Sequence, residues 1–279
     1  TVPRDAEDRN ESWLSDRDRY SHLGLYSDDR VTEPMVKEDG EWKTVSWDEA
    51  AAAVCTLLRE SVETHGAEQA GFLLSPSATV EEYFLAQRLA RGLGCNNIDH
   101  RLREQDFSDD AVRYAPVPFQ KSISELENSD VILLAGCNPR AEAPIIGHRI
   151  RKAWRAGASI SAFNPLDWEF IFDTSHNAFV APQHMVSELA ALAAAVERNS
   201  GKPVPEDLRA ALDRAGDSDR HAALAAQLRE AENGVVMLGQ AALSHPEAAL
   251  LRTLASYLAS ATGSALNVLA PGANSAGAW

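Results

Sequence analysis

The part of the sequence best suited to bind a ligand is an apolar strand that breaks into a tight turn. Val131–Ala135 is a continuous apolar run, and Gly136, Cys137, Asn138 and Pro139 follow it ahead of a helix-like stretch. The N-terminal end of a helix carries unpaired N–H groups and a positive dipole end, which attract phosphate. The segment contains neither G-x-G-x-x-G nor G-x-x-x-x-G-K-[ST], the glycine patterns of nucleotide sites. A plain strand-to-helix turn is therefore favoured, and a phosphate site is the alternative.

A second turn follows the next apolar run, Ala158–Phe163. Asn164 and Pro165 turn the chain there, and Asp167 lies 31 residues after Gly136. A carboxylate in this position could bind the hydroxyl groups of a ribose, but the usual interval in dinucleotide sites is about 20 residues. We favour the simpler interpretation, in which the Asn-Pro pair ends the strand.

The sequence gives little support for a metal centre or a nucleophile. His176 and His184 are eight residues apart, and no nearby Cys or Glu completes a tetrahedral ligand set. There is no G-x-S-x-G motif, and Ser244 and His245 are neighbours that cannot face each other as nucleophile and base. No residue is assigned a catalytic role.

The three cysteines are also unsuited to a framework of disulfides or metal ligands. Cys55, Cys95 and Cys137 are 40 and 42 residues apart, without any C-x-x-C pair. We expect reduced thiols that are mostly buried.

Charge and apolar run length exclude two classes of partner. The 279 residues carry a net charge of −15, whereas a nucleic-acid surface needs clustered Lys and Arg. The longest apolar runs, 131–135 and 190–196, fall far short of the roughly 20 residues that cross a bilayer. The chain begins at Thr1 with charged residues and shows no signal-peptide pattern. We expect a processed or excised piece of a cytosolic protein.

Alternating patterns along the chain predict an α/β protein. Strands are predicted at 70–74, 131–135, 159–163, 235–238 and 266–269. Helices are predicted at 79–93, 141–156, 185–199, 205–215, 219–232 and 246–262. Ser46 and Glu49 have the spacing of a capping box and predict one more helix, ending near residue 66. The alternation is typical of parallel β-α-β units, and the length suggests two domains.

Residues 1–45 differ from the rest of the chain. They are dense in charge and contain only isolated apolar anchors such as Trp13, Leu25 and Trp42. Such a segment cannot build its own core. We therefore predict an extended acidic arm that lies on the rest of the protein or on a neighbouring chain.

Several motifs, taken in order, resemble a known family. They are Asn10–Tyr20, Gly24–Leu25, Arg30–Val36, Ser46–Ala50, Asn97–Arg101, Leu134–Pro144 and Arg149–Lys152. Their order and spacing closely resemble the large iron–sulfur subunit of bacterial respiratory complex I, the NADH:quinone oxidoreductase. The resemblance spans most of the chain.

That subunit is similar over the same region to the molybdopterin oxidoreductases. The resemblance implies a molybdopterin-oxidoreductase-like α/β fold with two Rossmann-like, doubly wound parallel-sheet domains, one inserted in the other. The first domain would contain residues 46–120 and 233–279, and the inserted domain residues 121–232. The crossings would fall at 115–118 and at Asn233–Gly234. Gly136–Pro139 would be the vestige of a cofactor-binding loop.

Two positions depart from related metalloproteins. In formate dehydrogenases a Cys or selenocysteine that binds the metal follows an Asn-Asn-x-Asp stretch, and Gln105 aligns with it. An amide cannot supply a thiolate ligand. Some relatives hold an additional iron–sulfur cluster whose last Cys lies in W-x-C-D, where this sequence has Ser15. The resemblance implies no metal or cofactor in residues 1–279, with iron–sulfur clusters held by sequence upstream of Thr1.

The resemblance also implies a role. We expect a non-catalytic scaffold within complex I, which transfers electrons from NADH to quinone and couples this transfer to ion translocation. The expected partners are other subunits of the hydrophilic arm, on the cytoplasmic side of the bacterial inner membrane. Two alternatives stay open: an active molybdopterin-dependent oxidoreductase domain of the formate dehydrogenase type, and a stand-alone nucleotide-binding module.

Overall fold

The structure is a computed structural model of two units, and it describes residues 1–103, 105–110, 119–216 and 218–278. The smaller unit contains residues 1–2, 16–102 and 272–278. Residues 3–15 and the described part of 103–271 form the other unit, which we call the sheet unit. None of the described helices is long and apolar enough to cross a bilayer.

Five parallel strands form the centre of the sheet unit, in the order β7-β6-β5-β8-β9. β5 (Val131–Ala135) pairs with β6 (Ser159–Asn164) on one side and with β8 (Gly234–Leu238) on the other. β7 (His176–Phe179) and β9 (Ala265–Val268) are the edge strands. All residues of β5 are buried, as expected of a strand covered on both faces. Because the chain moves from β5 toward β6 and later returns on the opposite side at β8, the strand order reverses between β5 and β8.

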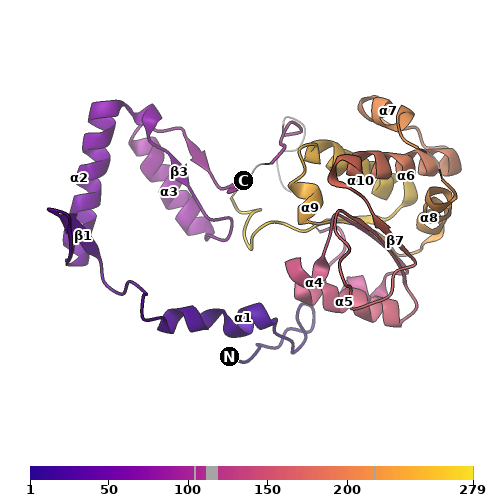
Figure 1. The fold of residues 1–279 in the computed structure, drawn as a ribbon, viewed down its shortest axis with the longest axis horizontal. Coiled ribbons are helices and arrows are strands. Elements are labelled where there is room, and N and C mark those ends of the chain that lie inside the picture. Colours follow the sequence, from indigo (N-terminus) through magenta and orange to yellow (C-terminus); the bar gives the residue numbers. More distant parts are fainter. Residues whose placement is uncertain (104, 111–118, 217, 279) are drawn as a thin grey trace. The chain divides into compact units, whose positions relative to one another are not determined.

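Helices cover both faces of this sheet (Figure 1), which is the doubly wound arrangement predicted by the alternating pattern. Ile132 and Leu134 of β5 pack against α5 on one face. Leu133 points to the other face and packs with the Ala-rich helices α6 and α10. The long helices are α5 (Pro144–Arg155), α6 (Met185–Ser200), α7 (Glu206–Asp213), α8 (Asp219–Glu230) and α10 (Ala248–Thr262).

Two short helices follow the central strands directly. α4 (Pro139–Glu142) comes after β5, and α9 (Gln240–Leu243) comes after β8. The prediction of a single helix over 141–156 is wrong, because α4 and α5 are separate helices. Pro144 disfavours a helical backbone at the residue before it, and Ala143 has φ −151° and ψ 80°. The predicted helix is therefore divided into α4 and α5.

The predicted division into two α/β domains is wrong in its C-terminal part. The prediction places residues 233–279 in a sheet with 46–120, but β8 and β9 belong to the sheet of β5. β8 pairs with the full length of β5, because both are continuous apolar runs that need cover on two faces. Asn233 and Gly234 thus lie within the sheet unit, where Gly234 begins β8, and the predicted crossing at 115–118 lies outside the described residues.

Only residues 272–278 of that C-terminal part group with the smaller unit. There the N–H of Asn274 donates to the carbonyl oxygen of Pro76 at 3.0 Å. An ideal Cβ on Gly272 would lie 2.6 Å from the same oxygen, so the two backbone segments are in close contact.

The smaller unit buries few side chains. α2 (Trp47–His65) begins with the predicted Ser46–Glu49 capping box, and α3 (Val80–Gly92) begins with a second capping box. β3 (Phe72–Leu73) and β4 (Ile98–Asp99) form a short parallel pair. Within the described chain, α2 contributes no buried residue and α3 contributes only Ala90.

The predicted arm of residues 1–45 is not one extended segment. Residues 3–15 belong to the sheet unit, whereas α1 (Asp16–Tyr20) and a 3-10 helix (Ser21–Tyr26) belong to the smaller unit. They lead to an antiparallel hairpin of β1 (Met35–Glu38) and β2 (Glu41–Thr44). Its turn residues are Asp and Gly, both with positive φ, as a two-residue hairpin turn requires.

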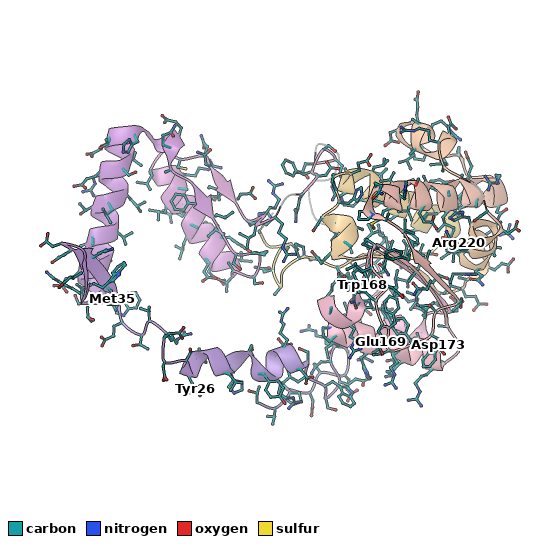
Figure 2. The ribbon with its side chains drawn as sticks, viewed as in Figure 1. Tyr26, Met35, Trp168, Glu169, Asp173 and Arg220 are labelled. Atoms are coloured by element: carbon teal, nitrogen blue, oxygen red, sulfur yellow. The ribbon has the colours of Figure 1, made fainter. Side chains whose placement is uncertain are left out.

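The hairpin was missed because its side chains are mostly exposed and give no core pattern. Tyr26 and Met35 extend from the ribbon of the smaller unit (Figure 2), and 78% and 41% of their respective surfaces are exposed. Neither side chain is buried in a core of the smaller unit.

Candidate functional site

The candidate site lies at the carboxyl ends of β5 and β8, where the strand order reverses. Ligands of open α/β sheets bind at such switch points. Gly136 follows β5 with φ +55°, a conformation that favours glycine. A Cβ there would lie 2.5 Å from the backbone nitrogen of Ala242, and a Cβ on Gly239 would lie 2.4 Å from Cα of Cys137. The two strand-end loops are therefore in backbone contact, which only glycine permits.

The carboxylate of Glu142 joins these two loops. Its Oε1 accepts a hydrogen bond from the N–H of Asn138 at 2.6 Å, and its Oε2 accepts one from the N–H of Gln240 at 2.8 Å. Hydrogen bonds from N–H groups to a carboxylate are short and about twice as strong as neutral ones. An anion supplied by the chain itself thus lies between the ends of β5 and β8.

Asn164, at the end of β6, completes the arrangement. Its Oδ1 accepts a hydrogen bond from the N–H of Cys137 at 2.8 Å. The residue is 1% exposed, and its Nδ2 has no hydrogen-bond partner among the described residues. A buried N–H donor without an acceptor costs free energy, so this amide is a potential contact for a ligand or a water molecule.

Burial changes the acidity of both ionisable groups in the loop. It raises the pKa of Cys137 well above its usual value, and the negative charge of Glu142 raises it further. The raised pKa favours the neutral thiol, which is a weaker nucleophile than the thiolate. Burial also raises the pKa of Glu142, although the N–H groups of Asn138 and Gln240 act in the opposite direction.

The structure places all four predicted loop residues, Gly136 to Pro139, at this site. It also brings Asn164 and Glu142 to them, and sequence reasoning assigned neither a role in the site. A signal for Glu142 was present, because an acidic residue in the first turn of a helix is typical of an N–H partner. Asp167 instead lies near Asn177, whose Nδ2 is 3.5 Å from its Oδ1, so the turn interpretation remains favoured.

Gln105 lies in a segment that is attached to α10. The neighbouring Asp106 accepts a hydrogen bond from the N–H of Ala249 at 2.8 Å, and Arg252 donates to Asp109 at 2.9 Å. Gln105 itself is partly buried. Among the described residues there is no group of three or more His, Cys, Asp and Glu side chains that could hold a metal. The role proposed for Gln105 stays a prediction.

Ser15 ends the segment 3–15, which a buried arginine fastens to the sheet unit. Arg149 is 2% exposed and donates to Glu11 at 2.8 Å and to Glu127 at 2.5 Å. Its other terminal nitrogen donates to the carbonyl oxygen of Glu7 at 2.6 Å. This part of the predicted arm therefore lies on the rest of the protein. Ser15 is buried, and its role as a lost cluster ligand is untested.

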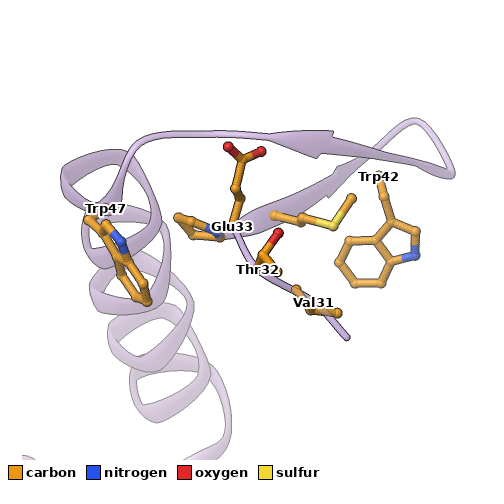
Figure 3. A pocket seen from close by; sticks show the side chains of 7 residues that line it. Val31, Thr32, Glu33, Trp42 and Trp47 are labelled. Carbon is orange, nitrogen blue, oxygen red and sulfur yellow. The ribbon is translucent and has the colours of Figure 1, made fainter. Parts of the chain in front are cut away.

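The smaller unit has an open apolar groove of about 700 Å³. Trp47, at the start of α2, and Trp42, on β2, stand on either side of Thr32 and Glu33 (Figure 3). Both indoles are more than half exposed. The groove lacks a convergent set of polar groups, so its chemistry does not identify a small-molecule ligand.

The fold and the site together define the class. In doubly wound sheets, ligands bind in the crevice at the carboxyl ends of the strands where the strand order reverses. The family model described as "Molybdopterin oxidoreductase" matches residues 30–278, and the chain belongs to this family.

Relatives within the family confirm the resemblance to complex I. The chain is 34% identical over 157 residues to an NADH-quinone oxidoreductase subunit of Rickettsia bellii, covering 56% of this chain and 22% of that protein. It is 29% identical to the mitochondrial 78 kDa subunit of NADH-ubiquinone oxidoreductase of Neurospora crassa, covering 72% and 26%. A putative formate dehydrogenase of Staphylococcus aureus is 31% identical, covering 52% and 15%. The chain thus spans about a quarter or less of these relatives' length.

Solved structures support the fold. Acetylene hydratase from Pelobacter acetylenicus superposes with a TM-score of 0.65 at 11% identity, covering 94% of this chain and 38% of that one. At this identity the likeness concerns the fold alone.

The family name implies a molybdopterin cofactor, and the loop does not fit its phosphate group. The N–H groups of Asn138 and Gln240, which face the switch point, already donate to Glu142. A phosphate in the same position would meet this carboxylate, and like charges in a site of low polarity repel strongly. Asn164 Nδ2, at the end of β6, is a buried donor without a partner among the described residues.

Proposed function

We propose that these residues form a non-catalytic structural module of the large iron–sulfur subunit of respiratory complex I. In this proposal the complex transfers electrons from NADH to quinone and couples the transfer to ion translocation. The similarity to the NADH-quinone oxidoreductase subunit of Rickettsia bellii supports the assignment to complex I. The observation that carries the non-catalytic part is the Glu142 carboxylate, which lies where the phosphate of a cofactor would bind.

The proposed partners are other hydrophilic-arm subunits, on the cytoplasmic side of the bacterial inner membrane. The surface of the smaller unit supports a role in assembly. Val54 and Leu57 on α2, and Phe84 and Leu85 on α3, are each more than half exposed. Large exposed apolar surfaces of this kind mark contacts with other protein segments.

No metal or cofactor is proposed for residues 1–279. Gln105 and Ser15 stand where related proteins place a metal-binding and a cluster-binding thiolate, according to the family resemblance. Amide and hydroxyl groups are poor substitutes for thiolate ligands of soft metals. The iron–sulfur clusters of the complete subunit are proposed to be held by sequence that precedes Thr1.

A second candidate is an active molybdopterin-dependent domain, which the likeness to a putative formate dehydrogenase favours. Against it, Cys137 is a neutral, fully buried thiol, and the anion position is filled from within. The same filled position argues against a stand-alone nucleotide-binding module.

The experiment that tests the proposal is metal analysis with visible absorption spectroscopy of the intact complex from its native host. Iron without molybdenum or tungsten is the expected result. Molybdenum or tungsten in about equal amount to this subunit would contradict the non-catalytic proposal, and absence of the chain from purified complex I would contradict the assembly.

A further inference from the structure

The two edges of the five-stranded sheet differ in how they are covered. At β9, the backbone N–H of Gln120 donates to the carbonyl oxygen of Leu266 at 3.2 Å, and the N–H of Leu266 donates to Oε1 of Gln120 at 2.8 Å. At the opposite edge, β7 pairs with β6 alone among the described residues. An edge strand presents a row of unpaired N–H and C=O groups, which can pair with another extended segment. The described part of the sheet unit therefore covers its edge at β9 and gives β7 no second strand.

Apart from its shortness, β7 lacks the features that protect an exposed edge. Its four residues, His176 to Phe179, include no Lys and no Pro. Phe179 is 68% exposed, and the alternation of side chains along a strand places it on the same face as Asn177. The amide nitrogen of Asn177 lies 3.5 Å from Oδ1 of Asp167, so the loop that precedes β7 reaches this face. Leu166 in the same loop is also more than half exposed, and an apolar surface thus borders the open edge.

The charge beside this edge is negative. Asp167, Glu169 and Asp173 are exposed, and residues 156–197 contain no Lys or Arg. Arg220 of α8 lines a small cavity with β7, but it is already in an ion pair within the sheet unit. A segment with Lys or Arg complements the acidic loop, whereas a second copy of this chain brings like charge to it.

We propose that the open edge of β7 binds an extended segment of another subunit of the same complex, and that this segment carries apolar side chains together with Lys or Arg. The segment pairs with the backbone of residues 176–179, covers Phe179 and Leu166, and places its basic groups beside the acidic loop. In this mode of recognition the backbone hydrogen bonds give affinity and the side chains give specificity. The inference rests on the proposed function, because it needs an assembly of several subunits.

The test replaces Phe179 by the photo-crosslinking residue benzoylphenylalanine in the full-length protein in its native host. The assembly is purified through this chain and irradiated, and the linked peptide is identified by mass spectrometry. We expect a link to one segment of another subunit, with Lys or Arg near the linked position. The same replacement at Glu206, exposed in the first turn of α7, is the control and should give no link to that segment.

Hydrogen exchange and a binding measurement check the pairing and the charge. Exchange of the amides of residues 176–179 should be about 5–30 times slower in the assembly than in the isolated chain, as one or two new backbone hydrogen bonds require. A synthetic peptide of the linked segment should bind the double variant Asp167→Lys, Glu169→Lys about ten times more weakly than wild type at low salt. The matched control Glu206→Lys, Asp207→Lys should bind it as wild type does.

Three results would overturn the inference: no link from Phe179 to another subunit, a link to a second copy of this chain, or equal binding of the peptide by both double variants. Its failure is distinct from that of the proposed function. If the chain is absent from complex I, the proposed function fails whatever segment Phe179 reaches. If the chain is present in complex I and residues 176–179 exchange as fast as in the isolated chain, this inference alone fails.

Discussion

At the scale of single residues, backbone contact between two loops sets the chemistry of the site. Gly136 and Gly239 bring the ends of β5 and β8 together, and this contact places two N–H groups where one side chain can accept from both. The sequence indicated the first glycine through its position after an apolar run. Gly239 could not be assigned in the same way, because its role depends on a strand pairing between residues about a hundred positions apart. The contact of Glu142 with Gln240 depends on the same pairing, whereas its contact with Asn138 is local.

Gly239→Ala should destabilise the sheet unit, because the new Cβ would lie 2.4 Å from a backbone atom of Cys137 that cannot move aside cheaply. Overpacking of this kind costs about 1–3 kcal/mol or somewhat more. Urea denaturation measures the change in the free energy of unfolding. Gly216→Ala is the control, since a Cβ there meets nothing within 4 Å. Equal effects of the two substitutions would contradict the loop contact.

At the scale of elements, α5 holds both the core and the N-terminal segment. One face packs Ile146 and Ile150 against the sheet, and Arg149 binds residues 3–15. The apolar part of this helix was predictable from periodicity. We call the contact of Arg149 with residues 3–15 the clamp. The clamp was not predictable, because nothing local to Arg149 indicates that its acceptors lie near the start of the chain.

Arg149→Met should cost about 3–5 kcal/mol of stability, because it leaves Glu11 and Glu127 without their buried partner. A double-mutant cycle with Glu11→Gln should show a clear coupling free energy. Arg151→Met, at an exposed position of the same helix, should change stability by no more than about 0.5 kcal/mol. Additive effects of the Arg149 and Glu11 substitutions would disprove the clamp.

The same cluster predicts how stability depends on pH. A hydrogen bond from Lys152 is the largest cause that lowers the pKa of Glu11 below 4.5, burial opposes the change, and His148 and Arg149 lower the pKa further. The unfolded chain therefore binds the proton more tightly. This contribution to stability is present above about pH 4.5 and is lost as pH falls through the folded-state pKa. Denaturation between about pH 6 and pH 3 should be less pH-dependent in Glu11→Gln than in wild type, and an unchanged slope would refute this.

At the scale of the whole molecule, the sequence predicted which segments are strands better than which strands are neighbours. Apolar runs identified β5 and β8 because strands buried on both faces read as continuous runs. β6 and β9 were also predicted, although each contains polar residues. Which strands pair in a sheet depends on contacts between distant residues, and local hydrophobic periodicity does not show these contacts. The prediction therefore placed β8 and β9 in the wrong domain. The edge strand β7 was missed because only Ala178 in it is buried.

Val236→Ala, in β8, tests that correction. The residue is fully buried and packs with Leu133 of β5 in the same core. The substitution should cost about 1–3 kcal/mol, and hydrogen exchange from global unfolding should become about 5–150 times faster across β5 and β6. Exchange in α2 should not change. Faster exchange in α2 with no change in β5 would favour the original domain division.

The clamp at Arg149 also has a consequence for synthesis of the protein. Glu11 precedes Arg149 by 138 residues. At about 5–20 residues per second, the segment 3–15 waits roughly 7–28 s on the ribosome before its docking partner exists. The many charged residues of this segment keep it solvated during that interval, since a segment of low hydrophobicity does not collapse on other nascent chains.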